Sequence, residues 1–264
     1  YKDALQMAVE YKDDFIQAQI VANLISLYRT TGDIVGYNHY QKELDSLYNV
    51  SNSAKLKTIY HIYWAKEYFA RKEFAMAETQ LQQCWNVMQD LSFSDREQAK
   101  LDYYSNMMNL KQQQKEYKDA IRFAKNHIEQ TKILNGRNCD LQYLSYSNLC
   151  KLYALNNDST EAFACLDSLE RGVGYSYQDK EVIANFYNIK GCCYADFKKY
   201  EKAIEYFNKA YNSLDGKMIE DSPSKFTSLL NKAEVYFVQK RYNDAFATYS
   251  RYVKACKNKY GETS

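Results

Sequence analysis

Three histidines, His39, His61 and His127, are the side chains in this 264-residue sequence best suited to acid–base catalysis or metal binding near neutral pH. They lie in three separate parts of the sequence and form no metal-binding motif. The sequence also lacks the glycine-rich motifs that bind phosphates and the motifs that carry a catalytic serine or a zinc ion. We therefore predict structural histidines and a chain that is not an enzyme, with no catalytic residue, no metal and no cofactor.

Cysteines are the second group of side chains that could carry chemistry. There are seven of them: Cys84, Cys139, Cys150, Cys165, Cys192, Cys193 and Cys256. Because seven is odd, at least one thiol has no partner within the chain, and no pair has the spacing of a zinc or redox motif. Most stand among apolar residues, where cysteine behaves as a small hydrophobic side chain. We expect buried free thiols. Together with the absence of a visible signal peptide, they favour the cytoplasm, while a periplasmic location stays open.

Charged residues show no strong bias. The carboxylate pairs Asp13-Asp14 and Glu220-Asp221 are expected at helix starts, where they complement the helix dipole. The lysines of residues 198–202 form a small basic cluster that we expect to be solvated. With 35 Lys and Arg against 33 Asp and Glu, the net charge of +2 argues against direct nucleic-acid binding by this region. The apolar runs are shorter than the roughly 18 residues that span a bilayer, so no membrane span is expected.

The composition indicates which elements position these residues. The chain has only eight Gly and one Pro, about a quarter of the usual share of these residues. β-Sandwiches and barrels need many turn residues, so they are disfavoured. Hydrophobic residues make up 46% of the chain and aromatic residues 16%, which is typical of a folded protein rather than a disordered one. The sequence therefore predicts an all-α fold.

A repeat runs through the sequence, and residues 184–217 show it most clearly. Gly191 and Tyr194 share one face of a first helix, while Ala203, Phe207 and Ala210 share one face of a second helix. We predict that Gly191 and Ala203 are small because two antiparallel helices cross there, and a large side chain would push the backbones apart.

The same pattern recurs along the chain with a period of 40–43 residues. The residues equivalent to Gly191 in the other repeats are Ile25, Ala65, Met108, Cys150 and Ala233. The first full repeat fits least well, because Tyr37 stands where its second helix should carry a small residue. Residues 1–11 have the pattern of a second helix alone. Expected helix starts include a capping box at Ser94–Glu97 and the Ser222 cap before Pro223.

This pattern resembles the tetratricopeptide repeat (TPR), a helix-turn-helix unit of about 34 residues, in the long-period form found in bacterial signalling and regulatory proteins. The resemblance implies an α-solenoid of about thirteen helices, a right-handed superhelix of stacked hairpins. It predicts a single repeat domain over residues 1–264. The expected boundaries are a half repeat at 1–11 and repeats at 14–50, 52–91, 94–134, 138–171, 177–216 and 222–258.

In the TPR family, ligand-facing residues come from fixed positions of each first helix, which lines a concave groove. Carried over to this sequence, these positions predict the following candidate ligand-binding residues: Arg29, Lys66, Asn109, Gln112, Lys151, Asn185, Asn188 and Glu234. Asn and Gln carry both donors and acceptors, so they can bind the backbone of an extended peptide. Equivalent positions also hold Gln19 and Asp102, and apolar residues expected to pack on a further helix or a partner, namely Ile59, Ile62, Phe69, Leu230 and Phe237.

These features favour a non-catalytic scaffold that binds a protein or peptide in its groove. The sequence starts and stops in mid-pattern, so we expect it to be the sensor or interaction region of a larger bacterial signalling or transcription-regulatory protein. Its output domain would then lie elsewhere in the same chain. The alternative is a peptide-responsive TPR regulator acting on a response-regulator partner, as a resemblance to the TPR phosphatases of Gram-positive bacteria would imply.

Overall fold

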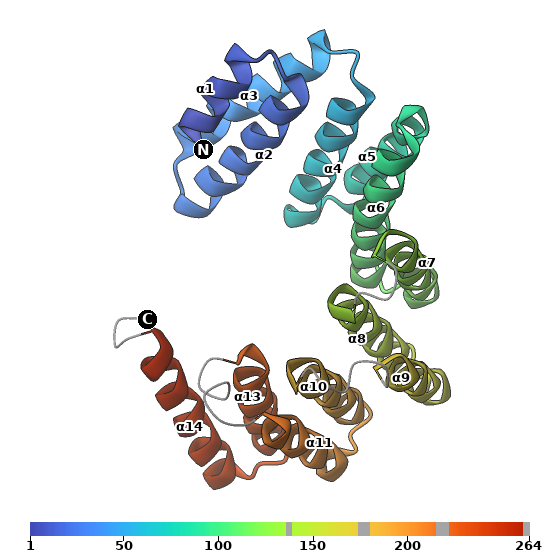
Figure 1. Ribbon diagram of the computed structural model, residues 1–264, viewed down its shortest axis with the longest axis vertical. Coiled ribbons are helices and arrows are strands. Elements are labelled where there is room, and N and C mark those ends of the chain that lie inside the picture. Colours follow the sequence, from blue (N-terminus) through green and yellow to red (C-terminus); the bar gives the residue numbers. More distant parts are fainter. Residues whose placement is uncertain (136–138, 174–179, 215–221, 261–264) are drawn as a thin grey trace. The chain divides into compact units, whose positions relative to one another are not determined.

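The computed structural model describes residues 1–135, 139–173, 180–214 and 222–260. Over these residues the chain forms thirteen α-helices, one short 3-10 helix and no β-strand (Figure 1), which confirms the predicted all-α fold. With the labels of Figure 1, the elements are α1 (Lys2–Glu10), α2 (Asp14–Thr31), α3 (Ile34–Val50), α4 (Ala54–Ala70), α5 (Phe74–Val87), η1 (Met88–Asp90), α6 (Phe93–Gln113), α7 (Tyr117–Asn135), α8 (Cys139–Leu155), α9 (Ser159–Val173), α10 (Lys180–Asp196), α11 (Tyr200–Ser213), α13 (Pro223–Val238) and α14 (Tyr242–Tyr260).

Consecutive helices pair into hairpins. Helix α2 packs on α3, α4 on α5, α8 on α9, α10 on α11 and α13 on α14. The first helices of neighbouring hairpins also touch: α2 contacts α4, α4 contacts α6, α8 contacts α10 and α10 contacts α13. The chain divides into two compact units, an N-terminal unit of residues 1–130 and a C-terminal unit of residues 131–264. Within each unit the structure confirms the predicted TPR-like stacking of helix hairpins.

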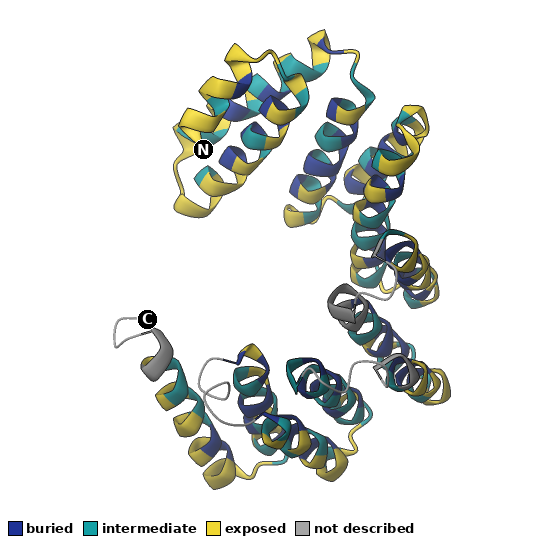
Figure 2. Ribbon diagram, viewed as in Figure 1, coloured by how far each residue is buried: buried dark blue, intermediate teal, exposed yellow. Residues whose placement is uncertain are grey.

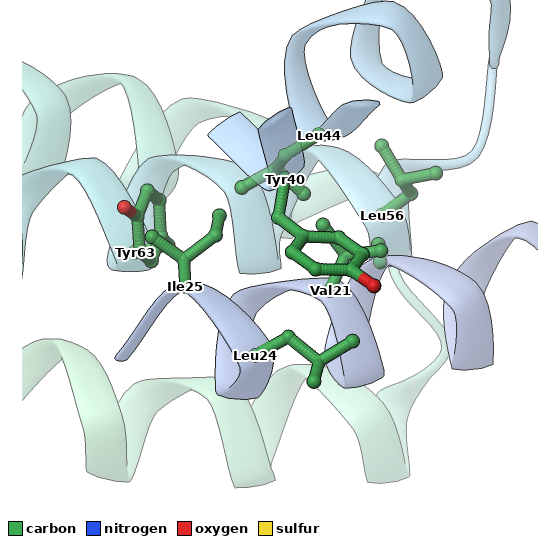
Figure 3. Close-up of a cluster of buried hydrophobic side chains, with 8 residues drawn as sticks. Val21, Leu24, Ile25, Tyr40, Leu44, Leu56 and Tyr63 are labelled. Atoms are coloured by element: carbon green, nitrogen blue, oxygen red, sulfur yellow. The ribbon is translucent and has the colours of Figure 1, made fainter. Parts of the chain in front are cut away.

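The core of the N-terminal unit forms where three helices meet (Figure 3). Leu24 and Ile25 of α2 follow Val21 by three and four residues, so the three share one face and pack against Tyr40 of α3 and Leu56 of α4. All five are at most 8% exposed. Figure 2 shows the same division along the other hairpins, with buried residues on the faces that meet a neighbouring helix. Full burial of each such aliphatic side chain contributes about 1.5–3 kcal/mol.

The C-terminal unit confirms the predicted helix crossing in α10 and α11. Ala203 is fully buried, and a Cβ atom added to Gly191 would lie 2.5 Å from Cε1 of Phe207. Real Cβ atoms do not approach another carbon this closely, so any side chain at residue 191 would force the Phe207 ring to shift. Small residues therefore let the two helices touch, as the sequence pattern indicates.

In the first full repeat, the small residue is not where the repeat pattern places it. A Cβ atom added to Gly36 would lie 2.6 Å from Cδ1 of Tyr28, so Gly36 supplies the close contact between α2 and α3. Tyr37, the residue that the repeat pattern places at the small-residue position, directly follows Gly36 on α3. The Tyr37 hydroxyl instead donates a hydrogen bond to Glu67 on α4. Tyr37 thus contacts the next hairpin, while its neighbour Gly36 allows the close contact within the hairpin.

The turns inside the hairpins share one backbone conformation that the sequence analysis did not predict. A residue with positive φ ends each first helix, and these residues are Gly32, Lys72, Lys115, Asn157, Lys198 and Lys240. Lys12 has the same conformation between α1 and α2. The residue that follows each of them donates its backbone N–H to the carbonyl oxygen five residues before it, for example from Glu73 to Tyr68 at 2.9 Å. This left-handed C-terminal cap closes the last turn of the helix.

Side-chain caps set several helix starts. Asp13 accepts from the N–H of Ile16, and Ser222 accepts from the N–H of Lys225 ahead of a helix that begins at Pro223, as predicted. The predicted capping box at Ser94–Glu97 is wrong, because Ser92 is the N-cap of α6 and accepts from the N–H of Asp95. Glu97 does not cap the helix and instead accepts hydrogen bonds from Lys100 and Gln130. The pair Glu220-Asp221 lies outside the described residues.

Candidate functional site

Arg29, a predicted ligand-facing residue, is bound within the chain. Its Nη1 donates to Oε2 of Glu67 at 3.2 Å, and Glu67 is only 5% exposed. Arg71 Nη2 and the Tyr37 hydroxyl donate to the other carboxylate oxygen, at 3.2 and 2.6 Å. A buried carboxylate needs such partners, because leaving it unpaired in a dry environment is costly. Arg29 therefore ties the first hairpin to the second, with its guanidinium half-exposed.

Three other predicted residues of the N-terminal unit are open to solvent. Lys66 on α4 and Asn109 on α6 are exposed, and Gln112 on α6 is half-buried. Among the residues that the structure describes, none forms a hydrogen bond or ion pair with these three side chains. Because α4 and α6 touch, all three stand on adjacent first helices. They have the accessibility that a ligand-binding role requires.

Asn188, in the C-terminal unit, differs from its prediction. It is 4% exposed, its Nδ2 donates to the backbone oxygen of Ser224 at 3.0 Å, and its Oδ1 accepts from the Ser228 hydroxyl at 2.8 Å. Both ends of the amide are thus used between α10 and α13. Asn188 joins two first helices rather than facing solvent, so its amide is not available to a ligand.

Asn185 and Glu181 belong to the same polar contact between α10 and α13. The Ser224 hydroxyl donates to Oδ1 of Asn185 at 2.5 Å, and the Ser222 hydroxyl donates to Oε2 of Glu181 at 2.6 Å. The backbone N–H of Ser224 also donates to Glu181, at 3.0 Å. Asn185 keeps partial exposure, so its amide nitrogen is still available to a ligand.

The partners of these residues were missed, although the sequence contains an indication of them. Ser228 follows Asn188 by 40 residues, and Ser224 follows Asn185 by 39. Both separations are close to the repeat period, because equivalent turns of neighbouring first helices lie side by side. Polar residues one period apart are therefore candidates for contacts between hairpins.

Lys151 on α8 and Glu234 on α13 are exposed, as a ligand-facing role requires. Both belong to the C-terminal unit. They carry opposite charges, so on this unit's first helices they offer one basic and one acidic position to a partner.

The histidines have structural surroundings. His61 is 3% exposed, with Nδ1 2.8 Å from Oε1 of Gln80, and burial lowers its pKa. Burial also lowers the pKa of half-buried His127, with the carboxylate of Asp102 acting in the opposite direction. The exposed His39 lies 3.9 Å from Oε2 of Glu43, one helical turn on.

The six cysteines whose side chains the structure describes are free thiols, and four of them are buried. Burial raises the pKa of Cys84 to about 12, so its thiol is protonated near neutral pH and is a poor nucleophile. In the described part of the chain, no group of three or more His, Cys, Asp or Glu side chains could hold a metal ion. None of the described helices combines the length and apolar character of a membrane span.

A pocket of about 170 Å³ opens on the first helices of the N-terminal unit. We call it the α2–α4–α6 pocket. Its lining residues are Phe15 and Gln19 from α2; Lys55, Thr58, Ile59 and Ile62 from α4; Leu91 from the segment before α6; and Asp95, Gln98, Ala99 and Asp102 from α6. Four of these, Gln19, Ile59, Ile62 and Asp102, are among the first-helix positions that the repeat pattern marks as ligand-facing. Three helices thus bring together residues that are far apart in the sequence.

The pocket has an apolar interior and a charged rim. Lys55 Nζ lies 2.8 Å from Oδ2 of Asp95 and 5.5 Å from the centre of the Phe15 ring. The hydrogen bonds from Lys55 and Ser92 lower the pKa of Asp95. Asp102 is exposed and forms no ion pair with any residue that the structure describes. One carboxylate at the rim is therefore neutralised, and the other is left as a net negative charge.

Several solved structures share this fold. The apo form of RapI has a TM-score of 0.66 at 13% sequence identity, over 92% of this chain and 65% of RapI. A signal-transduction ATPase with numerous domains and a TPR sensor, from Pyrococcus horikoshii, has a TM-score of 0.65 at 15% identity, over 96% of this chain and 37% of that protein. A Rap protein complexed with competence and sporulation factor has a TM-score of 0.59 at 12% identity, over 92% of this chain and 64% of that one.

At these identities the likeness shows the fold alone, which is a TPR-like array of helix hairpins. This chain spans less than two thirds of each of the two Rap chains and just over a third of the Pyrococcus protein. No family model and no curated protein matches the chain by sequence.

Proposed function

We propose that this chain is a non-catalytic module that binds an extended protein or peptide segment on its first helices. The observation that carries the proposal is the α2–α4–α6 pocket, because three consecutive first helices line it together. Lys66, Asn109 and Gln112 lie on two of the same helices with side chains free to bind a ligand. A site built from several repeats suits an extended ligand better than a compact one, since the repeats present their side chains in a row.

In our proposal the module is the sensor or interaction region of a larger bacterial signalling or transcription-regulatory protein. Its output domain lies elsewhere in the same chain, and this region does not itself bind nucleic acid. The TPR-like fold it shares with a sensor region and with a Rap protein complexed with competence and sporulation factor supports this assignment. The balanced charge supports a protein ligand rather than a nucleic acid.

The test is binding to a positional-scanning library of seven-residue peptides, measured by fluorescence polarisation. We expect selected pools to bind, and the double variant Lys66→Glu with Asn109→Ala to bind them more weakly. The control is Lys42→Glu, the same charge change at an exposed residue of the second helix α3. The proposal fails if no pool binds, or if the Lys42 variant loses as much binding as the double variant.

A second candidate is a regulator that responds to a peptide by controlling a response-regulator partner. The observation that favours this candidate is the fold likeness to two Rap chains, which extends over 92% of this chain in each case. This candidate expects an isolated receiver domain to bind the chain and a bound peptide to change that affinity. The scaffold proposal expects peptide binding with no response of this kind.

A further inference from the structure

The size of the α2–α4–α6 pocket limits what it can hold. Its volume is about 170 Å³, whereas pockets for drug-sized ligands or cofactors occupy about 300–1,000 Å³. An engineered apolar cavity of about 150 Å³ lined by Leu, Ile and Phe binds one benzene molecule. The pocket therefore has room for one aromatic ring or one branched aliphatic group.

The interior of the pocket suits such a group. Ile62 and Ala99 are 9% and 8% exposed, and they present only carbon atoms. Phe15, Ile59 and Leu91 are half-buried, so they keep apolar area that an entering group could cover. Transfer of an aromatic or aliphatic side chain onto this surface is favourable in proportion to the area removed from water.

The rim of the pocket adds a charge preference. Lys55 and Asp95 neutralise each other at 2.8 Å, and Lys55 is further held over the Phe15 ring. Asp102, at the other end of the lining on α6, forms no ion pair with a Lys or Arg of the described residues, and the pKa of the imidazole it acts on, that of His127, is lowered by burial. A ligand that places a positive charge beside its apolar group gains an ion pair with Asp102, and a negative charge there is repelled.

We propose that the α2–α4–α6 pocket binds one large apolar side chain of a partner segment and that Asp102 selects a lysine or arginine beside it. This inference rests on the proposed peptide-binding function and names the kind of segment bound. The chemistry is that of a basic, apolar peptide rather than a free small molecule, since the pocket holds a single side chain while neighbouring exposed residues remain available to a continuing backbone.

The probe is a fluorescein-labelled seven-residue peptide with one phenylalanine flanked by two lysines in a glycine-serine background. Replacing its phenylalanine with alanine should weaken binding about tenfold or more, the value of one buried ring. Replacing its lysines with glutamates should weaken binding roughly threefold or more at low salt and less at high salt. Free phenylalanine amide should compete poorly, and equal affinity for it would overturn the proposal in favour of a small-molecule site.

Variants of the chain test the same contacts. Ala99→Leu fills the pocket and should weaken binding of the phenylalanine peptide about tenfold. Ile59→Ala enlarges the pocket and should weaken it roughly fivefold, which keeps the test available if the first variant is unstable in a thermal melt. Asp102→Lys should reverse the preference between the lysine and glutamate peptides. The control Glu73→Lys makes the same charge change at an exposed position beyond the far end of α4 and should leave that preference intact.

Two failures are distinguishable. If no pool of the positional-scanning library binds, the proposed function fails and this inference fails with it. If pools bind but the Ala99, Ile59 and Asp102 variants bind them like the unchanged chain, only the assignment to this pocket is overturned. The assignment is also overturned if the tightest-binding peptide sequence from the library has no apolar residue next to a basic one.

Discussion

Gly191 and Phe207 are so close across the α10–α11 hairpin that a Cβ atom on residue 191 would lie 2.5 Å from Cε1 of the ring and 2.7 Å from Cδ1. Phe207 is 1% exposed, so its ring is packed on all sides. The same relation recurs in the first hairpin, where Tyr28 lies over Gly36. In both hairpins an aromatic ring fills the space that a missing Cβ leaves.

The first prediction concerns Gly191→Ala. Helix propensity alone would stabilise the chain by about 1 kcal/mol, because Gly191 is inside α10. We expect the opposite sign, a loss of roughly 1–3 kcal/mol in the free energy of unfolding, because the new methyl group overlaps a buried ring. Urea unfolding measures this. The double variant with Phe207→Leu should recover part of the loss, and a Gly191→Ala variant more stable than the original would refute the packing described here.

The second prediction concerns the left-handed turn residues. Lys72 has φ of 62° and is exposed, and in this conformation an L-residue costs about 1–2 kcal/mol relative to glycine. The entropy of glycine in the unfolded chain offsets part of that gain. We expect Lys72→Gly to raise the free energy of unfolding by about 0.5–1 kcal/mol, measured by urea unfolding.

Gly32→Ala is the matched reverse test of the turn. Gly32 has φ of 75°, and a Cβ atom there would meet nothing within 4 Å, so only backbone conformation is changed. We expect a loss of about 1 kcal/mol. An unchanged stability in both variants would mean that the turns relax out of the left-handed region.

The fold was predictable because its strongest determinant is local and periodic. Gly191 and Ala203 mark a helix crossing by their size, and equivalent positions return every 40–43 residues. Gly36 escaped the prediction because a fixed template assigns the crossing to Tyr37, and only the three-dimensional contact shows which neighbour faces Tyr28. The lysines with positive φ were not predicted, because lysine as a residue type does not indicate a left-handed backbone conformation.

The candidate site was less predictable because the type of a polar residue does not say what lies opposite it. Asn109 and Asn188 looked alike in sequence, yet the first is exposed and the second is enclosed between α10 and α13. Glu67 and Glu97 gave no sign of being buried, because each has a further partner on another helix, 38 and 33 residues away. A pocket has the same property, since its shape depends on three helices at once.

The third prediction separates those two asparagines. Asn188→Ala removes two buried hydrogen bonds, while the Ser228 hydroxyl and the Ser224 carbonyl keep the bond between them at 2.7 Å, so we expect a loss of about 1–3 kcal/mol in the free energy of unfolding. Asn109→Ala removes only an exposed side chain and should change stability by no more than about 0.5 kcal/mol. Equal effects of the two variants in urea unfolding would contradict the positions assigned to them.

The last prediction is a pH dependence. Glu97 on α6 is 5% exposed, and hydrogen bonds from Lys100 at 2.6 Å and Gln130 at 2.7 Å lower its pKa below the ordinary 4.5. The folded state therefore resists protonation of this carboxylate more than the unfolded state does. The resulting stability is fully present above the unfolded pKa and is lost as the pH falls through the folded pKa.

Glu97→Gln should remove this contribution. Urea unfolding between about pH 6 and pH 3 should show a smaller loss of stability with acid in the variant than in the unchanged chain. Glu205→Gln is the control, because Glu205 also meets a lysine at 2.6 Å and has a lowered pKa, but on an exposed surface. High salt should suppress the effect of the exposed pair more than that of Glu97, since buried charges are screened less. An acid dependence that is identical in the Glu97 variant and the unchanged chain would show that this carboxylate is not held as described.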